Sequence, residues 1–311
     1  MTELQATSEL PAWLDRSAYP FATRRVTLAG GGQLNYVDEG TGPIVLFVHG
    51  TPTWSFEWRH LIRALSRTHR CIAPDHLGFG LSDRPREASY APESHAARLG
   101  ELVEQLDLSD ITLVVHDFGG VIGLPLAVEE RSRVSRIVVI NSWMWDLGDD
   151  PGVRRVGRLF GGSLGRFLYE RLNFSLRVIT PAAFADRKRL TREIHAQYLA
   201  PFGDYRSRGL VLWPLARSLG HPSPHAARLW ERRATLANIP ALIVWGTRDP
   251  ALKPHNLERW REALPHAEVV PLEAGHWPHE ELPGVVRDSV TDFVVRSVKT
   301  LDAIRRAWQR F

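Results

Sequence analysis

The sequence predicts an α/β fold: a doubly wound, mostly parallel sheet of eight strands, with helices packed on it and a helical cap inserted between two strands. Three observations support this prediction. Short apolar runs typical of strands alternate with helix-like segments over most of the chain. The strand-like runs are apolar throughout, which is typical of parallel strands covered on both faces. Between residues 142 and 224 the strand pattern stops, and helix-like segments rich in arginine and aromatic residues follow.

The first half of the chain supplies six of the eight predicted strands. A glycine-rich turn at residues 30–32 joins two short strands within 25–39, and helices are expected at 54–65 and 93–106. Residues 111–115 form a continuous, largely β-branched run, so we expect this strand in the middle of the sheet. The other strands of this half are expected at residues 44–48, 70–73 and 136–140.

The second half of the chain completes the sheet and supplies the cap. We expect the last two strands at 241–245 and 267–272, a cap at 142–224, and a core made of 1–141 and 225–311. In doubly wound sheets the ligand binds beyond the carboxyl ends of the strands, so the cap should cover the site. Helices are expected at residues 153–160, 164–172, 189–199 and 205–218 in the cap, and at 226–236, 256–263 and 285–298 in the core.

The central run at 111–115 leads into the sequence HDFGG, and an apolar helix-like segment follows from Val121. A strand that turns sharply into a helix across small residues lifts the residue at the turn out of the sheet, in front of free helix N–H groups. Asp117 occupies that turn, where the serine of the G-x-S-x-G nucleophile elbow would stand. An aspartate is ionised at neutral pH, and it is suited to displacing a leaving group from saturated carbon, which leaves an alkyl ester on the enzyme. The alternative is that Asp117 only caps the helix.

Two side chains at other strand ends could form a catalytic triad with Asp117. Asp249 follows the strand at 241–245 and His276 follows the strand at 267–272, in the nucleophile, acid, histidine order of such folds. His276 would activate the water that hydrolyses the ester, and Asp249 would orient His276. As plainer alternatives, Asp249 is a turn residue and His276 a loop histidine. Less suitable candidates are His279 inside the next turn, His116 pointing away from the site, and the turn-stabilising residues Asp75 and Asp83.

From about residue 19 to 295 the chain resembles the haloalkane dehalogenase branch of the α/β-hydrolases. The matching motifs are HGTPTW at 49–54, PDHLGFGLSDRP at 74–85, HDFGG at 116–120, WGTRD at 245–249 and GH at 275–276. The resemblance implies an α/β-hydrolase fold and a hydrolase without cofactor or metal, in which Asp117 displaces halide and His276, held by Asp249, activates water. It also implies that backbone N–H groups of Thr51 and Phe118 stabilise the oxyanion.

The acid of the triad has two locations among such proteins. Some relatives carry it at the end of the preceding strand, where this chain has Asn141. Asn141 is not an acid, so the resemblance points to Asp249.

The chain departs from this branch at the halide site. Dehalogenases of this kind usually have a tryptophan directly after the nucleophile, and its indole N–H holds the departing halide. Here that residue is Phe118, which has no N–H donor in its side chain. Trp143, Trp145 and Trp213 lie in or near the cap and could supply an indole, although each is also read as part of the cap's core.

Other functions of the same fold stay open at this stage. Epoxide hydrolysis also uses an elbow aspartate and needs tyrosine hydroxyls from the cap, for which Tyr169, Tyr198 and Tyr205 are candidates. Close relatives decarboxylate β-lactones. A non-catalytic binding protein is a further alternative, and a serine esterase is disfavoured because no serine occupies the elbow.

Composition restricts partners and compartment. The formal net charge is +4, and the basic residues are scattered without a nucleic-acid motif, so we expect no nucleic-acid partner. Neither a secretory signal nor an apolar run of membrane-spanning length is recognisable, and Cys71 is the single cysteine, so we expect a cytoplasmic protein without stable membrane association. The expected partner is a small apolar organic substrate, and the expected state is a monomer or homodimer. Residues 297–311 read as a basic amphipathic tail that docks on the body or on a second copy.

Overall fold

The computed structural model describes residues 10–128 and 133–308, with the backbone alone for 297–308. Within these residues eight strands form one sheet in the order β1-β2-β4-β3-β5-β6-β7-β8. β2 pairs antiparallel with β1 and β4, and all other neighbours pair parallel. The predicted mostly parallel sheet of eight strands is therefore confirmed. The strands are β1 (Thr23–Thr27), β2 (Gln33–Glu39), β3 (Ile44–Val48), β4 (Arg70–Pro74), β5 (Ile111–Asp117), β6 (Val134–Ser142), β7 (Ala241–Gly246) and β8 (Glu268–Leu272).

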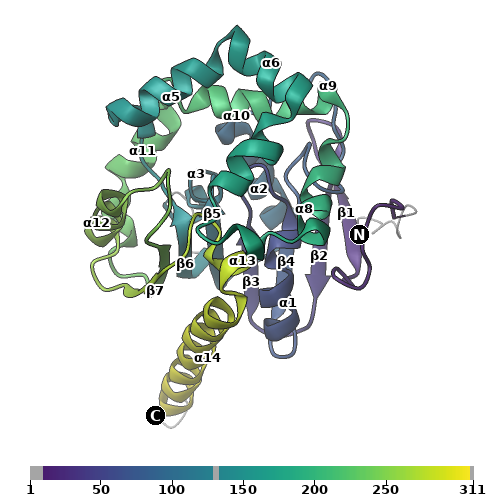
Figure 1. Ribbon diagram of the computed structural model, residues 1–311. Helices are drawn as coiled ribbons and strands as arrows, with labels where there is room; N and C mark the ends of the chain where they lie inside the picture. Colours follow the sequence, from purple (N-terminus) through teal and green to yellow (C-terminus); the bar gives the residue numbers. More distant parts are fainter. Residues whose placement is uncertain (1–9, 129–132, 309–311) are drawn as a thin grey trace.

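Helices cover both faces of the sheet. α1 packs beside α14 in front of it, and α2 beside α3 behind it (Figure 1). All seven residues of β5 are buried, as expected for the strand in the middle of such a sandwich. The core helices are η1 (Ser55–Trp58), α1 (Arg59–Leu65), α2 (Pro92–Gln105), α3 (Gly119–Gly123), α4 (Pro125–Val128), α11 (Pro224–Glu231), η8 (Arg233–Leu236), α12 (Pro254–Ala263), α13 (Pro278–Glu281) and α14 (Pro283–Trp308).

The segment between β6 and β7 contains helices and turns but no strand, and residues 143–240 are all described. Its helices α5, α6, α9 and α10 lie together over one end of the sheet (Figure 1). The exact division into core and cap stays a prediction. The helices that precede α11 in this segment are η3 (Leu147–Asp149), α5 (Pro151–Gly161), α6 (Ser163–Leu172), the π-helix η4 (Ser175–Ile179), α7 (Thr180–Ala182), η5 (Arg187–Arg189), α8 (Arg192–Leu199), η6 (Ala200–Phe202), α9 (Tyr205–Ser207), the π-helix η7 (Arg208–Leu212) and α10 (Trp213–Ser218).

Several predicted helices are divided or have other bounds in the structure, and two of them follow the elbow or end the chain. The helix after Asp117 is divided at Pro125, because proline has no N–H to continue the hydrogen-bond ladder. The last helix does not end at 298: α14 continues to Trp308 and extends away from the body (Figure 1). The backbone of the predicted tail therefore continues this helix as far as Trp308, and residues 309–311 lie outside the described part. None of the described helices is long and apolar enough to cross a bilayer.

Candidate active site

Asp117 stands at a strained turn between β5 and α3. Its φ is +50°, in the left-handed region that residues other than glycine rarely adopt. The two residues that follow Phe118 must be glycine, because a Cβ on Gly119 would lie 2.1 Å from the Val48 carbonyl oxygen, and one on Gly120 would lie 2.2 Å from that of Trp143. The sequence HDFGG thus fits this sharp turn, as predicted.

The carboxylate of Asp117 is buried and held by backbone. Its side chain is 9% exposed. The N–H of Thr51 donates to its Oδ2 at 3.1 Å, and the hydroxyl of Ser142 donates to the Asp117 carbonyl oxygen at 2.6 Å. Gly50 lies so close that a Cβ there would be 2.4 Å from the Cβ of Asp117. The loop after β3 therefore supplies the Thr51 N–H, which is one of the two N–H donors expected from the sequence.

Phe118 is the second residue expected to supply a backbone N–H. It is the N-cap of α3, and N–H groups at a helix start have no partner within the helix. The Phe118 side chain is buried and packs against the ring of Trp143. Its N–H therefore remains a candidate donor, while its side chain adds no polar group to the site.

His276 lies between the two acids named from the sequence. Its Nδ1 is 2.7 Å from Asp249 Oδ2, and its Nε2 is 3.5 Å from Asp117 Oδ1. Burial lowers the pKa of His276, but Asp249 and Asp117 outweigh burial and raise this pKa to about 10. The three strand-end residues are thus in one place, in the order expected of a nucleophile, a histidine and its orienting acid.

Asp249 is fixed by four hydrogen bonds. Its Oδ1 accepts from the N–H groups of Ala251 and Leu252, and its Oδ2 accepts from His276 and from the side-chain amide of Asn141 at 2.8 Å. Burial raises the pKa of Asp249, but His276 and these hydrogen bonds reverse that effect and lower it. Asp249 is therefore the ionised partner of His276.

Asn141 has a role that the sequence analysis missed. Its Oδ1 accepts from the Gly246 N–H at 2.7 Å while its Nδ2 donates to Asp249, so one amide holds both ends of the turn after β7. Its place at the end of β6, the strand between β5 and β7, was the available signal.

The main chain of His276 is also held from both sides. Its N–H donates to the carbonyl oxygen of Ala183 in the segment between β6 and β7, and its own carbonyl oxygen accepts from His116 Nε2, each at 2.9 Å. His116 thus points away from Asp117 and bonds backbone, as predicted. His279 lies in the short helix α13, and Asp75 and Asp83 accept hydrogen bonds from backbone N–H groups of loop and strand residues, also as predicted.

The three candidate tryptophans lie at different distances from the elbow. The ring of Trp143 is 4.8 Å from that of Phe118, and both residues line a small cavity of about 20 Å³ together with Trp145. The indole of Trp145 packs between Trp230 and Trp260. The candidate Trp213 has to be withdrawn. Its indole N–H donates to the Phe160 carbonyl oxygen inside the segment between β6 and β7, so it is not available to a leaving group.

The three candidate tyrosines do not converge on Asp117. Burial, with a smaller contribution from the charge of Asp117, raises the pKa of Tyr169 to about 12, so this tyrosine lies within electrostatic reach of Asp117. The hydroxyl of Tyr198 donates to Glu280 in α13, and Tyr205 is 39% exposed. Tyr198 and Tyr205 therefore do not support epoxide hydrolysis, which needs cap hydroxyls near the elbow aspartate.

A larger cavity of about 550 Å³ lies apart from the triad. It is lined by Trp13, Thr23, Arg25, Leu81, Pro201 and Asp204, among others. None of its lining residues is Asp117, Asp249 or His276, so the volume of this cavity gives no measure of the space above the candidate nucleophile.

Comparison with known proteins gives consistent results. The family model of the alpha/beta hydrolase fold matches residues 43–283. Haloalkane dehalogenase 2 of Mycobacterium tuberculosis is 34% identical over 281 residues, which are 89% of this chain and 96% of that protein. Cis-3-alkyl-4-alkyloxetan-2-one decarboxylase of Shewanella oneidensis is 33% identical over 280 residues, 86% of each chain.

Solved structures show the same likeness. The crystal structure of haloalkane dehalogenase DbeA from Bradyrhizobium elkani has a TM-score of 0.77 and 27% identity, covering 88% of this chain and 98% of that one. The extent of these matches, together with the sheet order and the elbow, shows that the chain belongs to the alpha/beta hydrolase family.

Proposed function

We propose that this protein is a cofactor-independent hydrolase that works through an ester on Asp117. The observation that carries the proposal is the contact of His276 with both Asp117 and Asp249, beside a Thr51 N–H that already binds one oxygen of Asp117. A carboxylate needs no base for its own attack, but the water that later hydrolyses the ester needs one. This arrangement supplies the carboxylate, Asp117, and a base, His276.

In the first step Asp117 Oδ1, which faces His276, attacks a saturated carbon. The bond from that carbon to the leaving group breaks, and the leaving group departs with the electron pair. Oδ2, held by the Thr51 N–H at 3.1 Å, becomes the carbonyl oxygen of the ester. The substrate is thereby bound covalently to the enzyme, and the carboxylate has lost its charge.

The second step is hydrolysis of this ester by water. Because the ester carries no charge, it no longer raises the pKa of His276, so the imidazole loses its own proton more easily and is then free to accept one from water. His276 Nε2 takes a proton from water, whose oxygen attacks the Asp117 carboxyl carbon. The negative charge that forms on Oδ2 is stabilised by the N–H groups of Thr51 and Phe118, and the alcohol leaves as the carboxylate reforms.

The reaction that we propose first is hydrolysis of carbon–halogen bonds, as in a haloalkane dehalogenase. Support comes from the dehalogenases at 34% identity over most of the chain. Trp143 is the candidate donor to the departing halide, because it stands next to Phe118 and carries an indole N–H. The net reaction consumes one haloalkane and one water and yields an alcohol, a proton and a halide ion.

A second candidate is decarboxylation of β-lactones. The decarboxylases at 32–33% identity support it, and so does Phe118, which offers no side-chain donor to a halide. If Asp117 attacks the saturated ring carbon that carries the ring oxygen, that bond breaks and the leaving carboxylate stays within the molecule, so no halide site is needed. Loss of carbon dioxide then breaks the ester C–O bond, returns its electron pair to Asp117 and leaves an alkene. Epoxide hydrolysis has less support, since only Tyr169 of the three tyrosines lies near Asp117.

The test is mass spectrometry of the His276→Phe variant after exposure to 1-bromobutane or to a cis-3,4-dialkyl-oxetan-2-one. Without the base, the ester on Asp117 should accumulate, and a peptide containing Asp117 should gain the mass of the transferred group. The double variant Asp117→Ala/His276→Phe is the matched control and should stay unmodified.

The outcome identifies the reaction. An adduct from bromobutane supports dehalogenation. An alkene and carbon dioxide from the lactone, without an adduct from bromobutane, support the second candidate. If a folded His276→Phe variant forms no adduct with either compound at high concentration and releases no alkene from the lactone, Asp117 is not the nucleophile and the proposal is wrong.

A further inference from the structure

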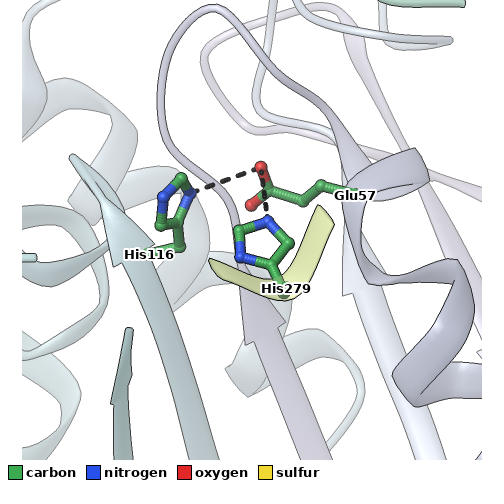
Figure 2. Close-up of side chains that lie close together, drawn as sticks. All are labelled: Glu57, His116 and His279. Carbon is green, nitrogen blue, oxygen red and sulfur yellow. Dashed lines mark ion pairs between the residues drawn. The ribbon is translucent and has the colours of Figure 1, made fainter. Parts of the chain in front are cut away.

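We propose that Glu57, His116 and His279 form a buried binding site for one divalent transition-metal ion, and that zinc fits it best. Figure 2 shows the three side chains turned toward one another from three separate elements. Glu57 lies in η1, His116 in β5 next to Asp117, and His279 in α13. The sequence analysis assigned no metal to this chain, and these residues lie too far apart in sequence to form a recognisable motif.

The distances suit a shared ion better than direct hydrogen bonds. Glu57 Oε2 is 3.4 Å from His116 Nδ1 and 3.7 Å from His279 Nε2, and the three groups bring their ligand atoms within 4.8 Å of one another. Charge-assisted hydrogen bonds are about 2.7–2.9 Å long. Two ligands at about 2.1 Å from a tetrahedral zinc ion are roughly 3.4 Å apart.

The tautomer of His116 leaves a lone pair facing the carboxylate. His116 Nε2 lies 2.9 Å from the carbonyl oxygen of His276, and because a carbonyl only accepts, Nε2 carries the hydrogen. In the neutral ring Nδ1 then has none, and it faces Glu57 Oε2. Two lone pairs repel each other unless a positive charge lies between them, and a metal ion supplies that charge.

The same hydrogen bond is the support that metal-binding histidines usually have. Such a histidine donates its other ring N–H to a carboxylate or a backbone carbonyl, which fixes the tautomer and the ring orientation. His116 already makes this contact, and the carbonyl belongs to His276.

Five polar atoms of the cluster have no hydrogen-bond partner among the described residues. Both oxygens of Glu57, Nδ1 of His116 and both ring nitrogens of His279 are buried without a hydrogen bond. The three residues are 1%, 0% and 2% exposed. A buried carboxylate without hydrogen bonds is costly unless a cation neutralises it.

Arg59, two residues after Glu57, does not supply that cation. Arg59 donates to both oxygens of Glu280, at 2.5 and 2.7 Å, and is committed to that ion pair. The ring of Trp58 stacks on His279 with 5.2 Å between centroids and closes one side of the cluster.

The types of ligand atom indicate which metal ion the cluster would bind. Two imidazole nitrogens and one carboxylate are typical zinc ligands, whereas calcium and magnesium prefer oxygen alone. The cluster is sealed from solvent and lies behind His276, so the ion would stabilise the fold and hold the His276 main chain through His116. It takes no part in the proposed reaction at Asp117.

The test is the metal content of the full chain, produced without a polyhistidine tag in zinc-supplemented culture and purified without chelators. We expect about one zinc per chain by plasma mass spectrometry. Glu57→Gln and His279→Gln should each lose most of it. His95→Gln, which changes a buried histidine outside the cluster, is the matched control and should retain it.

A second measurement keeps the proposal testable if the variants fold poorly. Wild-type protein produced with cobalt instead of zinc should show visible absorption bands of a bound Co²⁺ ion. Wild-type chain that holds less than a tenth of an equivalent of zinc, or variants that hold as much as wild type, would overturn the proposal. Neither measurement uses a substrate, so the result is independent of the proposed function.

Discussion

The substitution Asp249→Asn tests the assignment of the orienting acid. Asp249 Oδ1 accepts from the N–H groups of Ala251 and Leu252, so an asparagine at this position should keep its oxygen there. Its NH₂ group then takes the place of Oδ2 and faces His276 Nδ1, which lies 2.7 Å from Oδ2 in wild type. The amide donates to Nδ1, and the hydrogen of the neutral imidazole moves to Nε2. His276 then cannot accept a proton from water.

The magnitude follows from this change of tautomer. In a serine protease triad the same replacement lowers kcat about 10⁴-fold, which equals about 5.4 kcal/mol of barrier. We expect a loss of that order in ester hydrolysis, because that step needs the base. Attack by Asp117 needs no base and should continue. The new NH₂ group also faces the amide NH₂ of Asn141, which should destabilise the fold by about 1–3 kcal/mol.

The assay is bromide release from 1-bromobutane, followed from the first turnover. The Asp249→Asn variant should release one bromide per chain in a burst and then turn over about 10⁴-fold more slowly than wild type. Asp146→Asn is the control, since Asp146 accepts backbone N–H groups and does not contact the triad. Steady turnover within tenfold of wild type in the folded variant would refute the assignment of Asp249.

Three further predictions concern donors, packing and charge. Phe118→Trp adds an indole N–H beside Asp117 and should raise bromide release from bromoalkanes by about 10²-fold; unchanged release by a folded variant would contradict a halide site at this residue. Gly120→Ala places a Cβ 2.2 Å from a backbone oxygen and should lower the free energy of unfolding, measured in urea, by about 1–3 kcal/mol. Gly100→Ala, in the helix α2 with nothing within 4 Å of the new Cβ, is the control and should raise this free energy by about 1 kcal/mol. Equal effects of the two substitutions would show that the elbow tolerates a side chain. Arg59→Met leaves the buried carboxylate of Glu280 without its ion-pair partner and should lower the free energy of unfolding by about 3–5 kcal/mol in the same assay. Adding Glu280→Gln should recover part of this loss. No recovery would mean that the loss of Arg59 packing dominates.

The sheet and the triad could be predicted because both depend on local pattern. Asp117, Asp249 and His276 each follow an apolar run, and the carboxyl ends of parallel strands share one edge of a sheet. Their closeness therefore follows from three strand ends and the sheet order alone. Asn141 could have been included by the same reasoning, because it ends the strand between those of Asp117 and Asp249.

The contacts that the segment between β6 and β7 makes, with the rest of the chain and within itself, could not be predicted in this way. The hydroxyl of Tyr198 bonds Glu280, 82 residues away, and Trp213 bonds Phe160 within that segment. Both contacts depend on how short helices pack. Two other helices of the segment, η4 and η7, are π-helical, which no apolar period of 3.6 residues indicates. The cluster of Glu57, His116 and His279 likewise requires the three-dimensional fold, because no two of its members are close in sequence.

The hydrogen bond from His276 to Ala183 restricts how a substrate can be admitted. The inserted helical segment is joined at this point to the main chain of the proposed general base, so it cannot lift there without displacing His276. A substrate must therefore enter by a route that leaves this contact in place. Leu159 in α5 and Leu164 in α6 are more than half exposed, and they offer an apolar molecule its first contact with the protein.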